Sequence, residues 1–330
     1  MKKAIAGLLL CATTCCFYGN LKNNVEEGKA ECVMELYTHR VLYEKNGDTR
    51  LPMASTTKIL TAITVLELSE DLHEEVIIPA EATGVEGSSV YLQEGDRYSI
   101  EGLLYGLMLR SGNDCATALA LYCTGSVGGF STKMNEIAQK AGALDSNFQN
   151  PHGLPAYGHY TTARDLSAIS CYAMRNATFC AIVSTKYYHP YHWRNKNKML
   201  QQYDGAIGIK TGYTKEAGRC LVSAAERNGM TLVCTLLNCA TTYERTMELF
   251  DDAFSAYKMV KLVNDGELFT VDGKQAISKE EYSYPLLEGE EEALEYCIVP
   301  TKRMDDKEII GHLKIFLSKR LLFLTNLYKL

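Results

Sequence analysis

Two short apolar runs constrain the fold more than any other feature of this sequence. Residues 220–225 and 231–237 are rich in small and β-branched side chains, and Asn228-Gly229 lies between them. Asn-Gly favours a two-residue turn between antiparallel strands, because both of its residues tolerate a positive φ. The chain therefore contains an antiparallel hairpin here, and we expect the fold to be organised around a sheet that includes it.

Helical patterns occupy most of the chain before this hairpin. Apolar residues recur at helical spacing in four tracts before the hairpin and one after it: 55–69, 100–110, 116–123, 162–174 and 246–258. Thr162 and Asp165 have the spacing of a capping box. A second hairpin is predicted from residues 32–36 and 41–43. The pattern predicts an α+β fold, with an antiparallel sheet flanked by helices and a helical lobe.

The last part of the chain, residues 259–330, shows only short strand-like runs separated by Asp272-Gly273 and by glutamate-rich turns. We predict a small β-rich domain there. Its final stretch allows two interpretations. Residues 309–317 and 321–324 read as two strands joined by a turn at 318–320, which we favour. The alternative is an amphipathic helix that lies on a membrane surface.

The N-terminus has the pattern of a secretory signal. Lys2 and Lys3 precede an uncharged, largely apolar stretch over residues 4–18, which is too short to span a bilayer comfortably. We predict a signal peptide over 1–19, a polar linker over 20–31 and a main domain over 32–258. The chain would then be exported to the cell envelope, at the outer face of the cytoplasmic membrane or secreted. A buried N-terminal helix and a lipoprotein signal at Cys15-Cys16 are weaker alternatives.

Charge and cysteine content exclude several classes of function. The net charge of −6 is spread thinly along the chain, without the basic patch typical of a nucleic-acid-binding protein. The chain has 12 cysteines but no C-x-x-C pair, and many lie in apolar runs, so we interpret them as small buried hydrophobic residues. We predict no nucleic-acid partner, no metal and no cofactor.

Three short motifs carry the chemistry. Ser55-Thr-Thr-Lys58 opens the first helical tract, Ser111-Gly-Asn113 follows the second, and Lys210-Thr211-Gly212 begins the strand region. A serine hydroxyl needs a base within hydrogen-bonding distance to act as a nucleophile. Residues three apart share a helix face, so the amine of Lys58 is expected beside the hydroxyl of Ser55. The helix N-terminus would favour negative charge developing at Ser55.

Lys58 can act as a base only if its pKa is lowered. An ordinary lysine titrates near ~10.4, and both burial and a nearby positive charge lower that value. Lys210 is the expected like charge. A lowering of roughly three units corresponds to about 4 kcal/mol, which one buried neighbour and desolvation can supply together.

At these motifs the chain resembles the low-molecular-mass penicillin-binding proteins that act as D-alanyl-D-alanine carboxypeptidases. Five segments agree in order: 51–62 (LPMASTTKILTA), 109–116 (LRSGNDCA), 150–154 (NPHGL), 159–163 (HYTTA) and 208–214 (GIKTGYT) with Ala217-Gly218. The likeness covers roughly residues 30–258. It implies a β-lactamase/transpeptidase-like fold with a small C-terminal β domain.

The resemblance also implies roles for individual residues. Ser55 would be the nucleophile, Lys58 its base, and Ser111 a proton relay to the leaving amine. Asn113 would bind the peptide amide of the substrate, and Lys210, Thr211 and Arg245 would bind its terminal carboxylate. Gly212 and Tyr213 would contact the substrate from the same strand as Lys210. The backbone N–H groups of Ser55 and Tyr213 would form the oxyanion hole. The implied partners are a peptidoglycan stem peptide ending in D-Ala-D-Ala, and β-lactams as covalent inhibitors.

Alternative functions remain open at this point. A β-lactamase would need a glutamate to activate water, and Glu136 is the one glutamate between Asn113 and Lys210. Its sequence context differs from that of such a base, so we expect penicillin to acylate Ser55 and to leave slowly. A transpeptidase or endopeptidase could use the same site. A membrane sensor or an inactive scaffold is less favoured, because all reacting groups are present and no second long apolar stretch follows the first.

Overall fold

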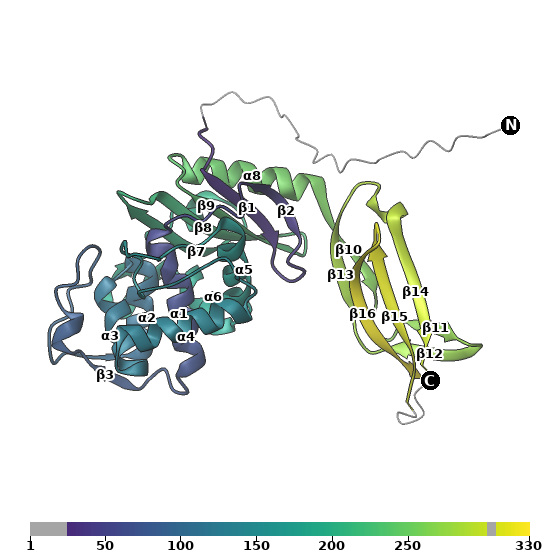
Figure 1. Ribbon diagram of the computed structural model, residues 1–330, viewed down its shortest axis with the longest axis horizontal. Coiled ribbons are helices and arrows are strands. Elements are labelled where there is room, and N and C mark those ends of the chain that lie inside the picture. The colour runs from purple at the N-terminus through teal and green to yellow at the C-terminus, as the bar shows by residue number, and fades with distance from the viewer. Residues whose placement is uncertain (1–24, 302–307) are drawn as a thin grey trace.

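The computed structural model describes residues 25–301 and 308–330, so the predicted signal peptide lies outside the described residues. The centre of the molecule is a five-stranded antiparallel sheet in the order β2-β1-β9-β8-β7. Its strands are β1 (Ala30–Glu35), β2 (Val41–Lys45), β7 (Ala206–Thr214), β8 (Gly218–Arg227) and β9 (Met230–Leu237). Figure 1 shows helices on both sides of this sheet.

The predicted hairpins are both present. β8 and β9 pair with each other and turn at Asn228 and Gly229, which have φ values of 51° and 73°. β1 and β2 form the second hairpin. β1 begins at Ala30, inside the stretch predicted as linker. Ala30 and Glu31 are both fully buried, and the polar character of Glu31 concealed its place in the strand.

Side chains alternate between the two faces of the sheet and build two cores. Cys32, Val222 and Ala224 pack into a core shared with the helical lobe. Val33, Leu221 and Leu236 point to the other face, where they pack against helix α8 (Thr242–Ala256). Because both faces are covered, β9 is buried along its whole length.

The helical lobe lies on the first face and carries the serine motif. Its main elements are the 3-10 turn η1 (Ala54–Thr57) and the helices α1 (Lys58–Leu68), α2 (Ile100–Tyr105), η3 (Gly106–Arg110, a π-helix), α3 (Asn113–Thr124), α4 (Val127–Lys140), α5 (Ala163–Met174) and α6 (Ala177–Ser184). Thr162 caps α5, since its side chain accepts a hydrogen bond from the backbone N–H of Asp165 (3.0 Å). The reciprocal half of the predicted capping box is not among the described hydrogen bonds, and the Asp165 carboxylate instead accepts from the backbone N–H of Asp145 and the hydroxyl of Ser146.

Helix α4 was not predicted. Its first turn contains Gly128 and Gly129, which are poor helix formers. The helix forms because Ser126 caps its N-terminus, and because Phe130, Met134 and Ile137 are buried in the lobe. Tertiary packing therefore overrides weak local propensity here.

Short elements complete the first 260 residues. They are β3 (Glu75–Ile77), η2 (Ala80–Ala82), β4 (Arg97–Ser99), β5 (Tyr187–Tyr188), η4 (His189–Tyr191), β6 (Trp193–Arg194) and α7 (Met199–Gln202). β3 pairs with β4 and β5 pairs with β6, both antiparallel.

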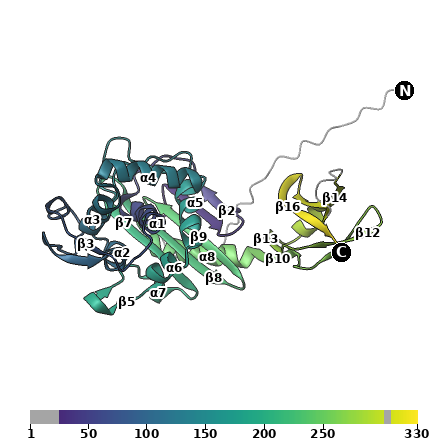
Figure 2. The ribbon, with the colours of Figure 1, turned by 90° about the horizontal axis from the view of Figure 1, so that it is seen from below.

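The chain leaves α8 directly into a separate C-terminal β domain (Figures 1 and 2). β10 (Tyr257–Val263) pairs with β13 (Tyr282–Leu287), and a five-stranded sheet has the order β11-β12-β16-β15-β14. Its strands are β11 (Leu268–Val271), β12 (Lys274–Ser278), β14 (Leu294–Pro300), β15 (Ile309–Leu317) and β16 (Arg320–Lys329), with the 3-10 turn η5 at Glu290–Ala293. The favoured prediction of two strands for the tail is confirmed, because β15 and β16 form a hairpin that turns at Ser318 and Lys319.

Arg40 connects this domain to the first. Its guanidinium donates to the backbone carbonyl of Pro285 (2.6 Å), pairs with Glu290 (2.6 Å), and lies over the rings of Tyr257 and Tyr284. An arginine can satisfy all of these partners because its planar group both donates several hydrogen bonds and stacks on rings.

Within residues 25–301 and 308–330, no single helix is long and apolar enough to cross a membrane. Only the bent pair α5–α6 meets that test, by length and composition alone.

The nine described cysteines are free thiols, and six of them are buried. Burial raises the pKa of buried thiols such as Cys220, to about 11, so they pack as apolar side chains.

Candidate active site

Ser55 and Lys58 lie where the sheet meets the helical lobe. Ser55 belongs to η1 and Lys58 is the first residue of α1. The expected contact is present, since the Lys58 Nζ donates a hydrogen bond to the Ser55 Oγ over 3.1 Å. Ala54, just before the serine, has a φ of 50°. A non-glycine residue in that region is strained, and such strain is concentrated at functional sites.

The amine of Lys58 is held by three oxygens in a buried position. Besides Ser55, it donates to the Asn113 Oδ1 (2.6 Å) and to the backbone carbonyl of His152 (2.6 Å). The side chain is 0% exposed. Burial lowers the pKa of Lys58 well below its ordinary value, and the charge of Lys210 lowers it further. These are the two causes anticipated from the sequence, and a lowered pKa is what a lysine needs in order to act as a general base, the role predicted for Lys58.

The Ser111-Gly-Asn113 turn joins η3 to α3 beside this lysine. Asn113 is 3% exposed and uses both ends of its amide: Oδ1 accepts from Lys58 and Nδ2 donates to the backbone carbonyl of Glu86. Because an amide nitrogen has two N–H donors, one remains for a substrate carbonyl. Ser111 is 5% exposed with a φ of 66°, and its hydroxyl makes no hydrogen bond to another described residue. Its relay role stays a prediction.

Strand β7, an edge strand of the sheet, forms the opposite wall. Lys210 is 2% exposed, and burial lowers its pKa to about 7. Its amine donates to the backbone carbonyl of Thr211 (2.9 Å). Gly212 faces η1 so closely that an added Cβ would lie 3.0 Å from the Met53 carbonyl oxygen and 3.1 Å from the backbone nitrogen of Ser55. Any side chain there would require β7 or η1 to shift by a few tenths of an ångström, so the glycine lets β7 pack close to the serine.

Tyr213 and Thr211 are more open. Tyr213 is 65% exposed and Thr211 is partly exposed. The structure thus brings together Ser55, Lys58 and Asn113 by direct hydrogen bonds, places Ser111 in the same turn as Asn113, and sets the Lys210-Thr211-Gly212 strand against η1.

The predicted substrate-binding role of Arg245 stays a prediction, and the structure shows which partners the side chain has now. Arg245 lies on α8 and is 7% exposed. Its guanidinium pairs with Glu31 on β1 (2.7 Å) and with Glu248 (2.9 Å), and also donates to the hydroxyl of Tyr43 on β2 (3.0 Å). β2 is the edge strand opposite to β7, and β1 is the strand next to it. Two carboxylates pair with this arginine and tie α8 to β1.

Several residues that support the site could not be recognised from the sequence. Gly153 has a φ of 88°, and a Cβ there would lie 1.9 Å from the Ala54 carbonyl oxygen. This close approach holds the His152 carbonyl on Lys58. The Asn150-Pro-His-Gly pattern by itself predicts only a turn, and its glycine was the signal that a close backbone contact was needed.

His159 and Asp114 stabilise the neighbouring loops. The backbone N–H of Gln149 donates to the Nδ1 of His159 (2.9 Å), so its Nε2 carries the proton and donates to the Thr57 Oγ1 (3.0 Å). Burial lowers the pKa of His159 to about 4, which keeps it neutral. Asp114 accepts hydrogen bonds from the hydroxyl of Ser89 (2.5 Å) and the backbone of Val90 (3.0 Å), and so fixes the loop that contacts Asn113.

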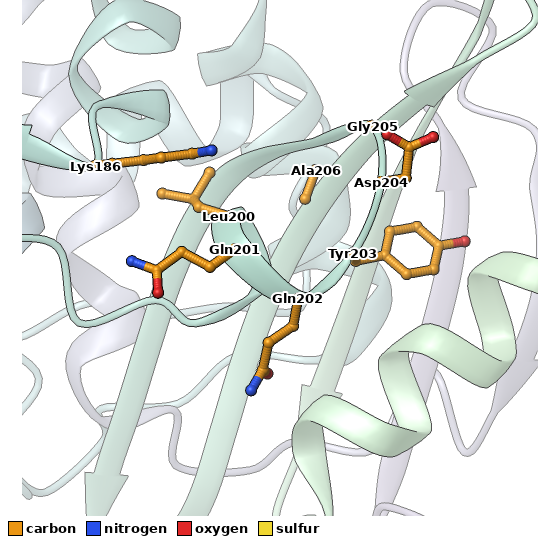
Figure 3. Close-up of a pocket in the computed structure, with 8 residues that line it drawn as sticks. All are labelled: Lys186, Leu200, Gln201, Gln202, Tyr203, Asp204, Gly205 and Ala206. Atoms are coloured by element: carbon orange, nitrogen blue, oxygen red, sulfur yellow. The ribbon is translucent and has the colours of Figure 1, made fainter.

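A cavity of about 370 Å³ lies elsewhere, at α7 and the beginning of β7. Figure 3 shows its lining, which is Lys186, Leu200, Gln201, Gln202, Tyr203, Asp204, Gly205 and Ala206. None of the motif residues lines this cavity, and it contains no pairing of a nucleophile with a base. We therefore assign the site to the residues of η1, the Ser111–Asn113 turn and β7 that surround the amine of Lys58.

The fold and this site define a class: proteins in which a buried lysine, three residues after a serine, contacts the serine hydroxyl between a helical lobe and an antiparallel sheet. A model of the D-alanyl-D-alanine carboxypeptidase family matches residues 22–241. The chain belongs to that family.

Individual relatives agree with this membership. The chain is 32% identical over 248 residues to the D-alanyl-D-alanine carboxypeptidase DacF of Bacillus subtilis, a match that covers 70% of this chain and 63% of that protein. It therefore spans less than two thirds of that relative.

Solved structures show the same architecture. Penicillin binding protein 5 from Haemophilus influenzae has a TM-score of 0.77 at 22% identity, over 94% of this chain and 98% of that one, which confirms the predicted fold including the C-terminal β domain. A mutant of the Streptomyces K15 DD-transpeptidase has a TM-score of 0.66 at 34% identity, over 71% of this chain and 100% of that one.

Proposed function

We propose that this protein is a serine-type D-Ala-D-Ala carboxypeptidase that removes the terminal D-alanine from peptidoglycan stem peptides through an acyl-Ser55 intermediate. The observation that carries the proposal is the buried amine of Lys58, 3.1 Å from the Ser55 Oγ and depressed in pKa. Membership of the D-alanyl-D-alanine carboxypeptidase family supports the substrate class.

Acylation begins when the Ser55 Oγ attacks the carbonyl carbon of the penultimate D-alanine. The serine proton passes to the neutral amine of Lys58, and the carbonyl oxygen becomes an oxyanion that the backbone N–H groups of Ser55 and Tyr213 stabilise. Each such donor is worth roughly 10²–10³ in rate. The tetrahedral intermediate then breaks the C–N bond, and the leaving D-alanine amine takes the proton from Lys58 through Ser111.

Water completes the reaction by attacking the acyl-serine ester, with Lys58 again accepting and returning the proton. The edge position of β7 suits this chemistry, because an edge strand offers unpaired backbone groups along which an extended peptide can bind. The free N–H of Asn113 would orient the carbonyl of the peptide from the opposite wall.

β-Lactams would acylate the same serine, and we propose that the adduct is long-lived. A β-lactamase needs a carboxylate to activate water at the acyl-enzyme. Glu136 cannot do this, since it lies on α4, pairs with Lys133 (2.8 Å) and has a side chain 55% exposed. Transpeptidation is the second candidate function, favoured by the 34% identity to a protein described as a DD-transpeptidase. It uses the same acyl-enzyme with an amine in place of water.

Export to the cell envelope follows from the predicted signal peptide over 1–19 and from the location of peptidoglycan outside the cytoplasmic membrane. Contact of the C-terminal tail with a membrane is not part of the proposal. β15 and β16 form a sheet hairpin instead of the amphipathic helix that would have favoured such contact.

The experiment that tests the function uses an N-acylated tripeptide ending in D-Ala-D-Ala, with and without glycine as an amine acceptor. We expect release of free D-alanine with water as the main acceptor, and no release by the Ser55→Ala variant. Predominant formation of the glycine-exchanged peptide would favour transpeptidation. Absence of any D-alanine release by the wild type would refute both.

A further inference from the structure

The side-chain amide of Asn113 has to keep one orientation for the proposed chemistry. Its Oδ1 accepts from the Lys58 Nζ (2.6 Å), and its Nδ2 donates to the backbone carbonyl of Glu86. A reversed amide would set N–H groups against those of Lys58 and an oxygen against the Glu86 carbonyl, which can only accept. The orientation therefore depends on the loop that presents the Glu86 carbonyl.

This loop, residues 83–96, contains no helix or strand and holds Asn113 at two points. Besides the Glu86 carbonyl at the side chain, the Ser88 carbonyl accepts a hydrogen bond from the backbone N–H of Asn113 (2.7 Å). Gly87 lies between them with a φ of 94°, and a Cβ there would be 2.8 Å from the Asn113 Nδ2. Because the contact is this close, a displacement of the loop would be transmitted to the amide.

Asp114, the residue after Asn113, holds this loop in place. It is 1% exposed. Its carboxylate accepts hydrogen bonds from the hydroxyl of Ser89 (2.5 Å) and from the backbone N–H groups of Val90 (3.0 Å) and Leu92 (3.2 Å). A loop outside helices and sheets needs such partners for its buried backbone groups, and here one carboxylate supplies them for three consecutive turns of the loop backbone.

The charge of Asp114 also acts on the proposed base. The titratable side chains that face Lys58 are Lys210 on β7, Lys196 after β6, Asp114 and Cys115 on α3, and His152 in the turn that contacts the amine. Burial lowers the pKa of Lys58, the charges of Lys210 and Lys196 lower it further, and the charge of Asp114 raises it. Burial raises the pKa of the Cys115 thiol and lowers that of His152 to about 3, so both are neutral. Asp114 is thus the acidic group of this set.

We infer that Asp114 is a positioning residue of the site: its carboxylate fixes the 83–96 loop, and the loop fixes the Asn113 amide with its oxygen toward Lys58 and one N–H free for the substrate. Asp114 acts through Asn113, because its own oxygens are occupied by the loop. A neutral side chain at position 114 would leave buried N–H donors of the loop without their acceptor, which is costly. This inference rests on the proposed function, because it concerns the same site.

The test measures the rate of acylation by a fluorescent penicillin across pH for a set of variants. Asp114→Asn and Ser89→Ala both weaken the hold on the loop, and Ser89→Ala keeps the charge of Asp114. Asn113→Ala, alone and combined with Asp114→Asn, shows whether Asp114 acts through that amide, because residues that act through one another have non-additive effects.

The matched control is Asp165→Asn. Asp165 is 7% exposed and also holds a loop, since its carboxylate accepts from the backbone N–H of Asp145 (2.7 Å) and from the hydroxyl of Ser146 (2.7 Å). That loop lies at the N-terminus of α5, so the control has a similar buried carboxylate without the link to Asn113.

For Asp114→Asn we expect the plateau rate at high pH to fall roughly 10- to 100-fold, the cost of a misplacement of about 1 Å in the site. The rise of the rate with pH should move to lower pH, because loss of the Asp114 charge lowers the pKa of Lys58 further. Ser89→Ala should lower the plateau by roughly 2- to 10-fold, the loss of one hydrogen bond, with the pH profile in place. Asp114→Asn added to Asn113→Ala should cost less than about 3-fold more. Asp165→Asn should keep the wild-type plateau and pH profile.

The inference is overturned if Asp114→Asn has the plateau or the pH profile of the wild type, if its loss multiplies in full with that of Asn113→Ala, or if Asp165→Asn loses as much. Thermal unfolding of each variant identifies misfolding. If Asp114→Asn does not fold, Ser89→Ala decides the same question, since a full loss on top of Asn113→Ala would overturn the inference. A wild type that is not acylated and releases no D-alanine refutes the proposed function itself, which is distinguishable from these outcomes.

Discussion

The contact between Gly153 and the residue before the serine gives the sharpest structural prediction. A Cβ at position 153 would lie 1.9 Å from the Ala54 carbonyl oxygen, 2.4 Å from its carbon and 3.0 Å from the Ser55 nitrogen. Ordinary contact begins at 3.4 Å, so Gly153→Ala requires about 1.5 Å of movement between two backbone segments. Neither segment can move independently of the site, because one carries Ser55 and the other presents the His152 carbonyl to Lys58.

The expected cost has two parts that a control separates. Alanine at a φ near 88° costs about 1–2 kcal/mol by itself, and overpacking adds about 1–3 kcal/mol. Gly142 has nearly the same backbone conformation, with a φ of 86°, but nothing lies within 4 Å of the point that a Cβ would occupy there. Gly142→Ala should therefore show only the first part.

Activity should separate the two variants further. A misplacement of about 1 Å at reacting groups can cost roughly 10²-fold in rate. We expect the rate of acylation by a fluorescent penicillin to fall by about that factor in Gly153→Ala and to stay at the wild-type value in Gly142→Ala. Urea unfolding of both variants measures the stability terms. A Gly153→Ala variant that acylates within about 3-fold of the wild type would refute the account of this contact.

Two further predictions concern the charges. The rate of acylation should rise with pH through the pKa of Lys58, because only the neutral amine accepts the serine proton. Burial and then the charge of Lys210 lower that pKa, so Lys210→Gln should raise it and move this rise in rate to higher pH. The measurement is the acylation rate of both proteins from about pH 4 to about pH 9. An unmoved rise would show that Lys210 does not tune the base. Arg245→Ala should lower the free energy of unfolding by about 3–5 kcal/mol, because it leaves the buried carboxylate of Glu31 without its cation. In urea titrations the folded fraction should still acylate at the wild-type rate, and a selective loss of acylation would support a substrate role for Arg245.

Much of the fold could be predicted because local and long-range signals agree. Asn228-Gly229 specified the central hairpin, and helical spacing located α1, α3, α5 and α8. Helix α4 was missed because its glycine-rich first turn has weak propensity and forms by packing Phe130 into the lobe. The extent of β1 was missed because a buried, paired Glu31 has the appearance of a solvated linker residue.

The site was predictable to the extent that it depends on residues close in sequence. The spacing of Ser55 and Lys58 implied their contact, and burial of two lysines implied a depressed pKa. The pairing of Arg245 with Glu31 could not be predicted, because the two residues are 214 positions apart and spacing cannot reveal such a contact. The role of Gly153 likewise depends on a close approach to a backbone about 100 residues earlier in the chain.

The most direct test of the central claim is the intact mass of the protein after incubation with benzylpenicillin, for the wild type, for Ser55→Ala and for Lys58→Ala. The account predicts a single long-lived adduct on the wild type, no adduct on Ser55→Ala, and strongly slowed formation on Lys58→Ala, since the serine loses its base. An adduct that persists in Ser55→Ala, or one that forms on Lys58→Ala at the wild-type rate, would contradict it.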